Sequence, residues 1–355
     1  MLPSGDVPSL PALLGFVAVL APVLGRAEVV SRALSVEAEL GAGLDDNPDR
    51  LTGSGSPAAE FLSLLVKARG SLEGEGAQVR ATLIEGGRLY PGPSQADAVA
   101  SLFEASASAG LSRTLTAGLE LRASDLSEEG QVLDDDTVRA QALLAYRVGR
   151  LRARLGAGFG LDRPRGPTLW AFEALGPEAS IGLEVVPARQ HALSAGYAVE
   201  YDDYPRFAEL AQRERADTTQ TLLVDYRYDG DFLAGLGYAY AWNRSSAPGG
   251  DFERHRLTAR LAAYLPLELT LALRVALQWS HYPQPLYLEE QLLLAEENQN
   301  LLEVRLTRPL CEGLELALAG SAYREEATPG TPAPGFARDL VSLSLVWRGS
   351  WRSVR

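Results

Sequence analysis

Residues 34 to 45 read LSVEAELGAGLD, and this stretch sets the pattern for most of the chain. Leucine, valine and alanine occupy the even positions, whereas serine, glutamate, glycine and aspartate occupy the odd ones. Successive side chains of a β-strand point to opposite faces, so a period of two predicts a strand with one apolar and one polar face. The same alternation returns at 115–122, 151–159, 257–263, 269–277 and 341–347.

Extended along the chain, this alternation predicts about sixteen strands. The predicted strands cover residues 32–45, 60–72, 76–89, 98–111, 114–125, 137–148, 151–163, 170–186, 191–204, 218–229, 232–244, 254–265, 268–282, 299–310, 314–326 and 338–348.

The connections between these strands alternate in length. Tight turns such as GEG (74–76), GR (149–150), DGD (229–231) and CEG (311–313) are typical of hairpins. The intervening connections are longer and polar, as in DDNPDRLTGSGSP (45–57), SEEGQVLDDD (127–136), RFAELAQRERAD (206–217) and REEATPGTPAPGFARD (324–339). Short turns at one end and long loops at the other, with an even strand count, are typical of bacterial outer-membrane barrels.

The predicted fold is therefore all-β, a single transmembrane antiparallel β-barrel over residues 28–355, with short periplasmic turns and long extracellular loops. The alternative is a soluble β-sandwich or solenoid. A sandwich seals both inner faces with bulky apolar residues, whereas here the second face carries arginine, glutamate, glutamine, threonine and glycine. Such a face suits contact with water and favours the barrel.

The N-terminal run LLGFVAVLAPVL (13–24) has the length of a signal-peptide core and is too short to span a membrane as a helix. The small residues Gly25 and Ala27 lie at positions −3 and −1 of a predicted cleavage before Glu28. The alternative is a buried core helix or a membrane anchor. A signal peptide over 1–27 agrees with a location in the bacterial outer membrane.

The composition excludes several other classes of function. A net charge of −13 argues against nucleic-acid binding, which requires a basic face. One cysteine cannot form an intramolecular disulfide, and with only three histidines no metal site or cofactor is expected. The chain contains no G-x-S-x-G, P-loop or H-E-x-x-H motif.

Two segments carry a resemblance to a known class. The DDNP turn (45–48) is similar to the acidic turn that follows the first strand of porin-like outer-membrane barrels, including the barrels that accompany exopolysaccharide secretion in Gram-negative bacteria. VSLSLVW (341–347) resembles the final strand that the barrel assembly machinery reads, although RGSWRSVR follows it here. The resemblance implies the lipid bilayer, the assembly machinery and either a polysaccharide or a periplasmic export partner as partners.

The positions opposite the apolar face predict which charges line the lumen. The candidate lining residues are Arg139, Arg147, Arg152, Arg154, Arg260, Arg274, Arg305, Glu37, Glu39, Glu120, Glu200 and Glu303. They form either ion-pair ladders along the wall or a charged constriction that selects solutes. Among them, Arg139, Arg147, Arg152 and Arg154 are the densest basic group, which favours an anion-selective wall.

Two histidines offer the one enzymatic alternative. His255 and His281 lie near the loop ends of two predicted neighbouring strands, beside Ser280, as in a membrane hydrolase. No carboxylate partner is evident in the sequence. The expected function is a non-enzymatic channel for polar solutes or exported polysaccharide, and the alternatives are a lipase-type hydrolase and a plugged structural or adhesive barrel.

Overall fold

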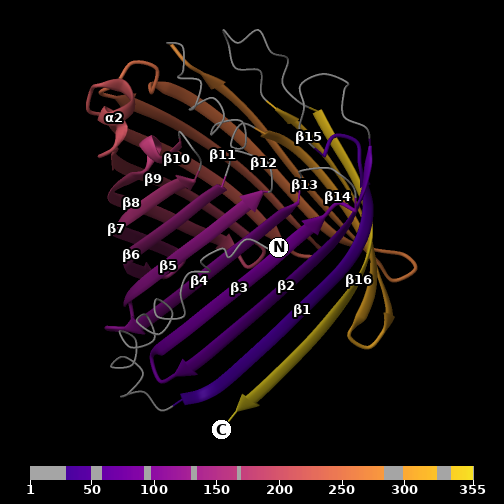
Figure 1. Ribbon diagram of the computed structural model, residues 1–355. Helices are drawn as coiled ribbons and strands as arrows, with labels where there is room; N and C mark the ends of the chain where they lie inside the picture. Colours follow the sequence, from indigo (N-terminus) through magenta and orange to yellow (C-terminus); the bar gives the residue numbers. More distant parts are fainter. Residues whose placement is uncertain are drawn as a thin grey trace.

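The computed structural model of the chain is one closed antiparallel β-barrel (Figure 1). It describes residues 29–48, 58–91, 97–128, 134–165, 169–283, 299–325 and 337–354. Each strand pairs with its neighbours in sequence, and β1 closes the wall by pairing with β16. The prediction of a single barrel of sixteen strands is confirmed.

Most strands are bounded as the two-residue alternation predicts, within a few residues. The strands are β1 (Val29–Asp45), β2 (Ala59–Gly74), β3 (Ala77–Leu89), β4 (Ala98–Gly110), β5 (Leu115–Glu128), β6 (Asp134–Val148), β7 (Leu151–Arg165), β8 (Ala174–Ala188), β9 (His191–Asp203), β10 (Ala216–Asp229), β11 (Phe232–Ser245), β12 (Phe252–Leu265), β13 (Leu269–His281), β14 (Gln299–Cys311), β15 (Leu314–Glu325) and β16 (Ala337–Val354).

The two ends of the barrel differ as the sequence predicts. Ser31 pairs with Val354, so the start of β1 and the end of β16 lie together at the end that carries the short turns. The short helix α2 (Phe207–Ala211) lies at the opposite end from the C-terminus (Figure 1). We call these the short-turn end and the loop end.

Three segments differ from their predicted form. The strand predicted from residue 170 begins only at Ala174, because η1 (Leu169–Phe172) precedes it. The connection 206–217, expected to be a polar loop, contains α2, whose buried Phe207 packs edge-to-face on Phe172. The apolar side chains of these two connections pack together, and short helices form where a strand start and a polar loop were predicted. The third difference is that β16 continues to Val354, six residues past its predicted end.

The wall exposes apolar side chains on its outer face and carries its polar side chains inside, the reverse of a soluble protein. On its outer face Leu40 and Leu343 are 63% and 53% exposed, whereas Asp45, on the inner face, is fully buried. Apolar side chains that remain exposed around a closed wall match the lipid-facing band of a membrane barrel. A soluble protein does not expose so continuous an apolar surface.

Small residues allow close contacts on the inner face. A Cβ atom on Gly43 would lie 2.6 Å from the Phe61 ring, and one on Gly160 would lie 3.2 Å from Nη1 of Arg139. Glycine at these two positions therefore leaves room for the Phe61 ring and the Arg139 guanidinium beside the backbone.

Among the described residues, no helix combines the length and apolar character needed to cross a membrane. The predicted signal peptide, residues 1–27, lies outside the described residues.

Candidate functional site

The inner wall toward the loop end holds a compact cluster around Arg139. Its guanidinium donates to Asp162 at 2.9 Å, to Glu178 at 3.4 Å and to Glu200. These four side chains come from β6, β7, β8 and β9. The guanidinium of Arg139 on β6 therefore reaches Glu200 on β9, past the two strands between them, on the concave inner face of the wall. The cluster compensates three carboxylates with one arginine, and Asp202 adds a fourth carboxylate close by.

A second set of ion pairs joins the last strands to the first. Arg305 on β14 donates two hydrogen bonds to Glu39 on β1, at 3.0 and 2.8 Å. Arg348 donates to Glu37 at 2.6 Å and also pairs with Glu315. The pairs of Arg305 with Glu39 and of Arg348 with Glu37 cross the β1–β16 seam from the inside, so they reinforce barrel closure.

The remaining candidate lining residues are more open. Arg274 is 3.5 Å from Glu303, and Arg260 lies directly opposite Arg274 in register. Together with Arg305 they border a recess of about 770 Å³ in the wall. Glu120 faces Gln141 across the β5–β6 pair.

The short-turn end has a different character. Arg147, Arg152 and Arg154 are exposed and make no ion pair within the part of the chain that the structure describes. Arg139, predicted to form one basic wall with them, lies toward the loop end and is paired with carboxylates instead. The predicted basic group therefore consists of Arg139, which is neutralised by carboxylates, and three solvent-exposed arginines.

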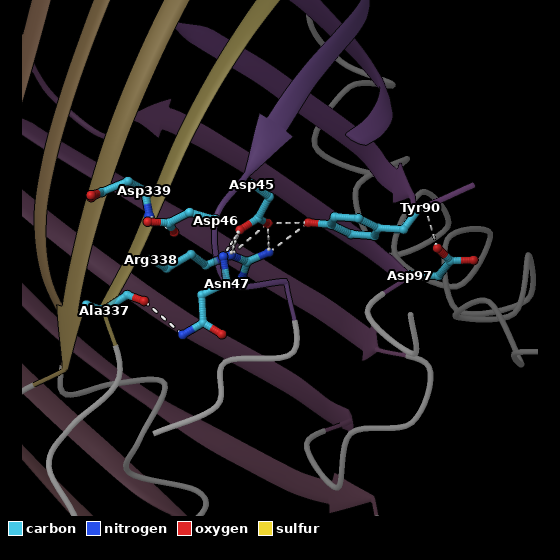
Figure 2. A network of polar contacts seen from close by, with 8 residues as sticks. All are labelled: Asp45, Asp46, Asn47, Tyr90, Asp97, Ala337, Arg338 and Asp339. Atoms are coloured by element: carbon cyan, nitrogen blue, oxygen red, sulfur yellow. Dashed lines mark hydrogen bonds and ion pairs between the residues drawn. The ribbon is translucent and has the colours of Figure 1, made fainter. Parts of the chain in front are cut away.

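The acidic turn after β1 is part of a buried network that the sequence analysis did not find (Figure 2). The Asp45 carboxylate accepts from Nε and Nη2 of Arg338, at 2.9 and 2.6 Å, and from the Tyr90 hydroxyl at 2.5 Å. Burial raises the pKa of the Tyr90 phenol, so the hydroxyl stays protonated and donates. Phe61 and Leu340 cover the network with apolar contacts.

Neighbouring residues fix the same turn to β16. The backbone N–H of Asp46 donates to the Asp339 carbonyl, and the Asp339 N–H donates back to the Asp46 carboxylate. The Asn47 side chain donates to the Ala337 carbonyl at 2.8 Å. The DDNP turn therefore joins the first strand to the last at the loop end. The acidic pair Asp45 and Asp46 was the one feature of the sequence that marked this turn.

A second compact region lies over β8 to β12 at the loop end. Phe172, Phe207 and Ala247 form a buried apolar cluster from three connections. Arg215 lies 4.5 Å from the Tyr204 ring centroid and pairs with Asp217 at 2.7 Å, and both charged side chains are almost fully buried. Cation–π contact and ion pairing together hold these connections against the rim.

His255 and His281, the two histidines of the hydrolase hypothesis, lie on the outer face. The His255 ring stacks on Trp279 with centroids 5.1 Å apart, and its Nδ1 lies 2.7 Å from the Tyr238 hydroxyl. His281 lies opposite Glu253 in register, a carboxylate neighbour that the sequence did not reveal. Ser280 points to the inner face and contacts Arg254, so the serine and histidine of the hydrolase hypothesis lie on opposite sides of the wall.

The closed wall, the exposed apolar outer face and the charged inner face together define a transmembrane β-barrel of the outer-membrane type. Within this class, a mutant form of the porin of Rh. blastica has a TM-score of 0.39 and 13% identity, with 89% of this chain and 100% of that chain covered.

Two further solved structures are similar in the same way. Acinetobacter baumannii OccAB3 has a TM-score of 0.46 at 10% identity, with 90% of this chain and 99% of that one covered. Pseudomonas aeruginosa OpdQ has a TM-score of 0.45 at 10% identity, with 91% and 98% covered. No protein-family model and no curated protein matches the chain.

Proposed function

We propose that the chain forms a non-enzymatic, water-filled channel for polar solutes across the bacterial outer membrane. One observation carries this proposal: exposed charged side chains line the inner face of a closed wall whose outer face exposes leucine. A barrel of sixteen strands is wide enough to leave an aqueous lumen. The opposite orientations of Ser280 and His281 favour a channel over a hydrolase.

Planar-bilayer recording tests the channel directly. Mature protein, refolded in detergent and added to one chamber, is expected to produce stepwise increases in ion current. A correctly folded protein without current would overturn the channel and favour the plugged structural or adhesive barrel. Protein that stays monomeric and soluble without detergent would contradict the membrane location as well.

The identity of the cargo is a narrower proposal. An exported polysaccharide, with a periplasmic export partner, is suggested by the resemblance of the DDNP turn to porin-like barrels, a class that includes the barrels accompanying exopolysaccharide secretion. Neutral dextran and an acidic polysaccharide, added separately during recording, should then interrupt the current as chains enter the lumen. Interruption by neither would leave small polar solutes as the cargo.

Assembly and export provide two further proposals. The final strand, with Trp347 and Trp351 both exposed on the outer face, is proposed to be read by the barrel assembly machinery. Residues 1–27 are proposed to be removed on export, which N-terminal sequencing of the protein from isolated outer membranes would check.

A further inference from the structure

The seven short turns are unequally charged. Three consecutive turns, those of β4–β5, β6–β7 and β8–β9, carry Arg113, Arg150 and Arg189. The other four turns carry acidic residues, namely Glu75, Asp231, Glu268 and Glu312. In a chain of net charge −13, this concentration of arginine on one side of the rim is a local reversal of charge.

The basic turns border a recess. A cavity of about 440 Å³ lies between the β6–β7 and β8–β9 turns and is lined by Arg147, Arg150, Arg152, Arg189 and Glu184, among others. The four arginines are exposed and form no ion pair within the described ranges. One carboxylate, Glu184, faces them, opposite Arg152 in register.

Two of the arginines are placed where like charges repel. Arg147 and Arg152 are directly opposite each other on the β6–β7 hairpin. Like charges in that relation destabilise a sheet, so their pairing is not explained by stability. An oxyanion between them would remove the repulsion, because guanidinium groups bind carboxylate and phosphate through paired N–H donors.

The recess is held in shape before any ligand arrives. The Arg147 N–H donates to the Thr114 carbonyl at 2.7 Å, which ties the β4–β5 turn to β6. The Val186 N–H donates to the Arg150 carbonyl at 3.0 Å, and Nη1 of Arg150 donates to the Pro187 carbonyl. A site whose backbone is fixed in advance loses less free energy to ordering when it binds.

We infer that this recess binds small solutes that carry two or more carboxylate or phosphate groups at the short-turn opening of the lumen. Arg147 and Arg152 lie on the inner face, where a solute entering the channel passes, and Arg150 and Arg189 lie on the turns beside it. The inference names a solute class for the proposed channel and therefore rests on that proposed function. Exposed arginines on one side of the opening would also raise the local concentration of such anions.

Side-specific block of the ion current tests the inference. Tripolyphosphate, added to one chamber at a time, is expected to block from the short-turn side. Cys311, the single cysteine, is exposed at the β14–β15 turn, so a thiol reagent too bulky to pass the lumen, such as a maleimide on a large polyethylene glycol, reacts only from the chamber that faces this end. In the double variant Arg147→Gln/Arg152→Gln the blocking concentration should rise by about tenfold or more, since charge-assisted hydrogen bonds are lost.

Controls separate the recess from a general effect of charge. Arg308→Gln removes one positive charge from the outer face of β14 near the same end, and it should leave the block unchanged. Arg147→Lys keeps the charge without the paired donors and should give an intermediate blocking concentration. Equal block in wild type and in the double variant, with both correctly folded, would overturn the inference while the channel stands.

A binding measurement tests the recess even if the protein proves not to be a channel. If the folded protein carries no current, the broadening of the phosphorus NMR signals of tripolyphosphate by detergent-solubilised protein still reports on the recess. Broadening that disappears in the double variant would support the site although the channel had failed. Broadening that is absent from wild type, or unchanged in the double variant, would overturn the site.

Discussion

Arginines at the two ends of the barrel differ in what surrounds them. At the loop end, Arg338 and Arg215 are 7% and 4% exposed and each contacts an aspartate at 2.6 to 2.7 Å. At the short-turn end, Arg147 and Arg152 are exposed and face each other. The same residue type therefore stabilises the fold where it is buried and paired, and remains available to solute where it is open.

Removal of a buried partner should produce the largest effect of this difference. Arg338→Ala leaves the Asp45 carboxylate buried without its cation, which is expected to lower the free energy of unfolding by about 3 to 5 kcal/mol. Urea unfolding of protein folded in lipid vesicles measures this change. The matched control is Arg324→Ala, whose pair with Asp339 is half exposed and should contribute under about 1 kcal/mol. Equal costs for the two variants would contradict the comparison.

Arg139 occupies an intermediate position, because its side chain is about one-third exposed and has three carboxylate partners. Arg139→Gln is expected to cost about 2 kcal/mol of unfolding free energy, discounted for solvent screening. It should also raise the permeability to cations, because the carboxylates lose their counter-charge. The reversal potential in a salt gradient reports the selectivity. Arg154→Gln is the matched control, because it removes an inner-face arginine that pairs with no carboxylate among the described residues. An unchanged selectivity would place the cluster outside the conducting path.

Tyr90→Phe should have a smaller effect, of about 1 kcal/mol. The variant keeps the ring against Phe61 and removes only the hydroxyl that donates to Asp45. Because Arg338 still pairs with the carboxylate, the network should survive. The same urea titration checks this prediction, and a loss as large as that of Arg338→Ala would mean that the tyrosine holds the network together.

Arg147→Gln should change stability least, by under about 0.5 kcal/mol or towards higher stability. The substitution relieves repulsion with Arg152 and breaks no ion pair among the described residues. A cost above about 1 kcal/mol in the urea titration would show that this arginine is structural, and the distinction between the two ends would fail.

Much of the barrel could be predicted because its signals are local. The alternation of Leu40 and Leu343 with small or charged neighbours reports which face meets lipid, and glycine-containing turns mark the hairpins. The strand that was predicted from residue 170 was placed too early, because η1 forms through contacts with Phe207, far along the chain. The alternation of polar and apolar residues does not predict packing between connections that are distant in sequence.

The charged partners were the least predictable feature. The alternation placed Arg139 on the inner face with Arg147 and Arg152. Nothing in the sequence indicated that three other strands would bring carboxylates into ion-pair contact with Arg139. Asp45 stood out in the DDNP turn, whereas its partner Arg338 is 293 residues away. Side-chain partners depend on strand tilt and on closure of the sheet, neither of which is written in any one segment.

The sequence by itself determined the strands, their two faces and the division into short turns and long loops, because a pleated strand turns each successive side chain to the opposite side. Only the tertiary structure decided which arginines are neutralised and which stay open. That outcome depends on distances across neighbouring strands, which are set when the first strand pairs with the last and the wall closes.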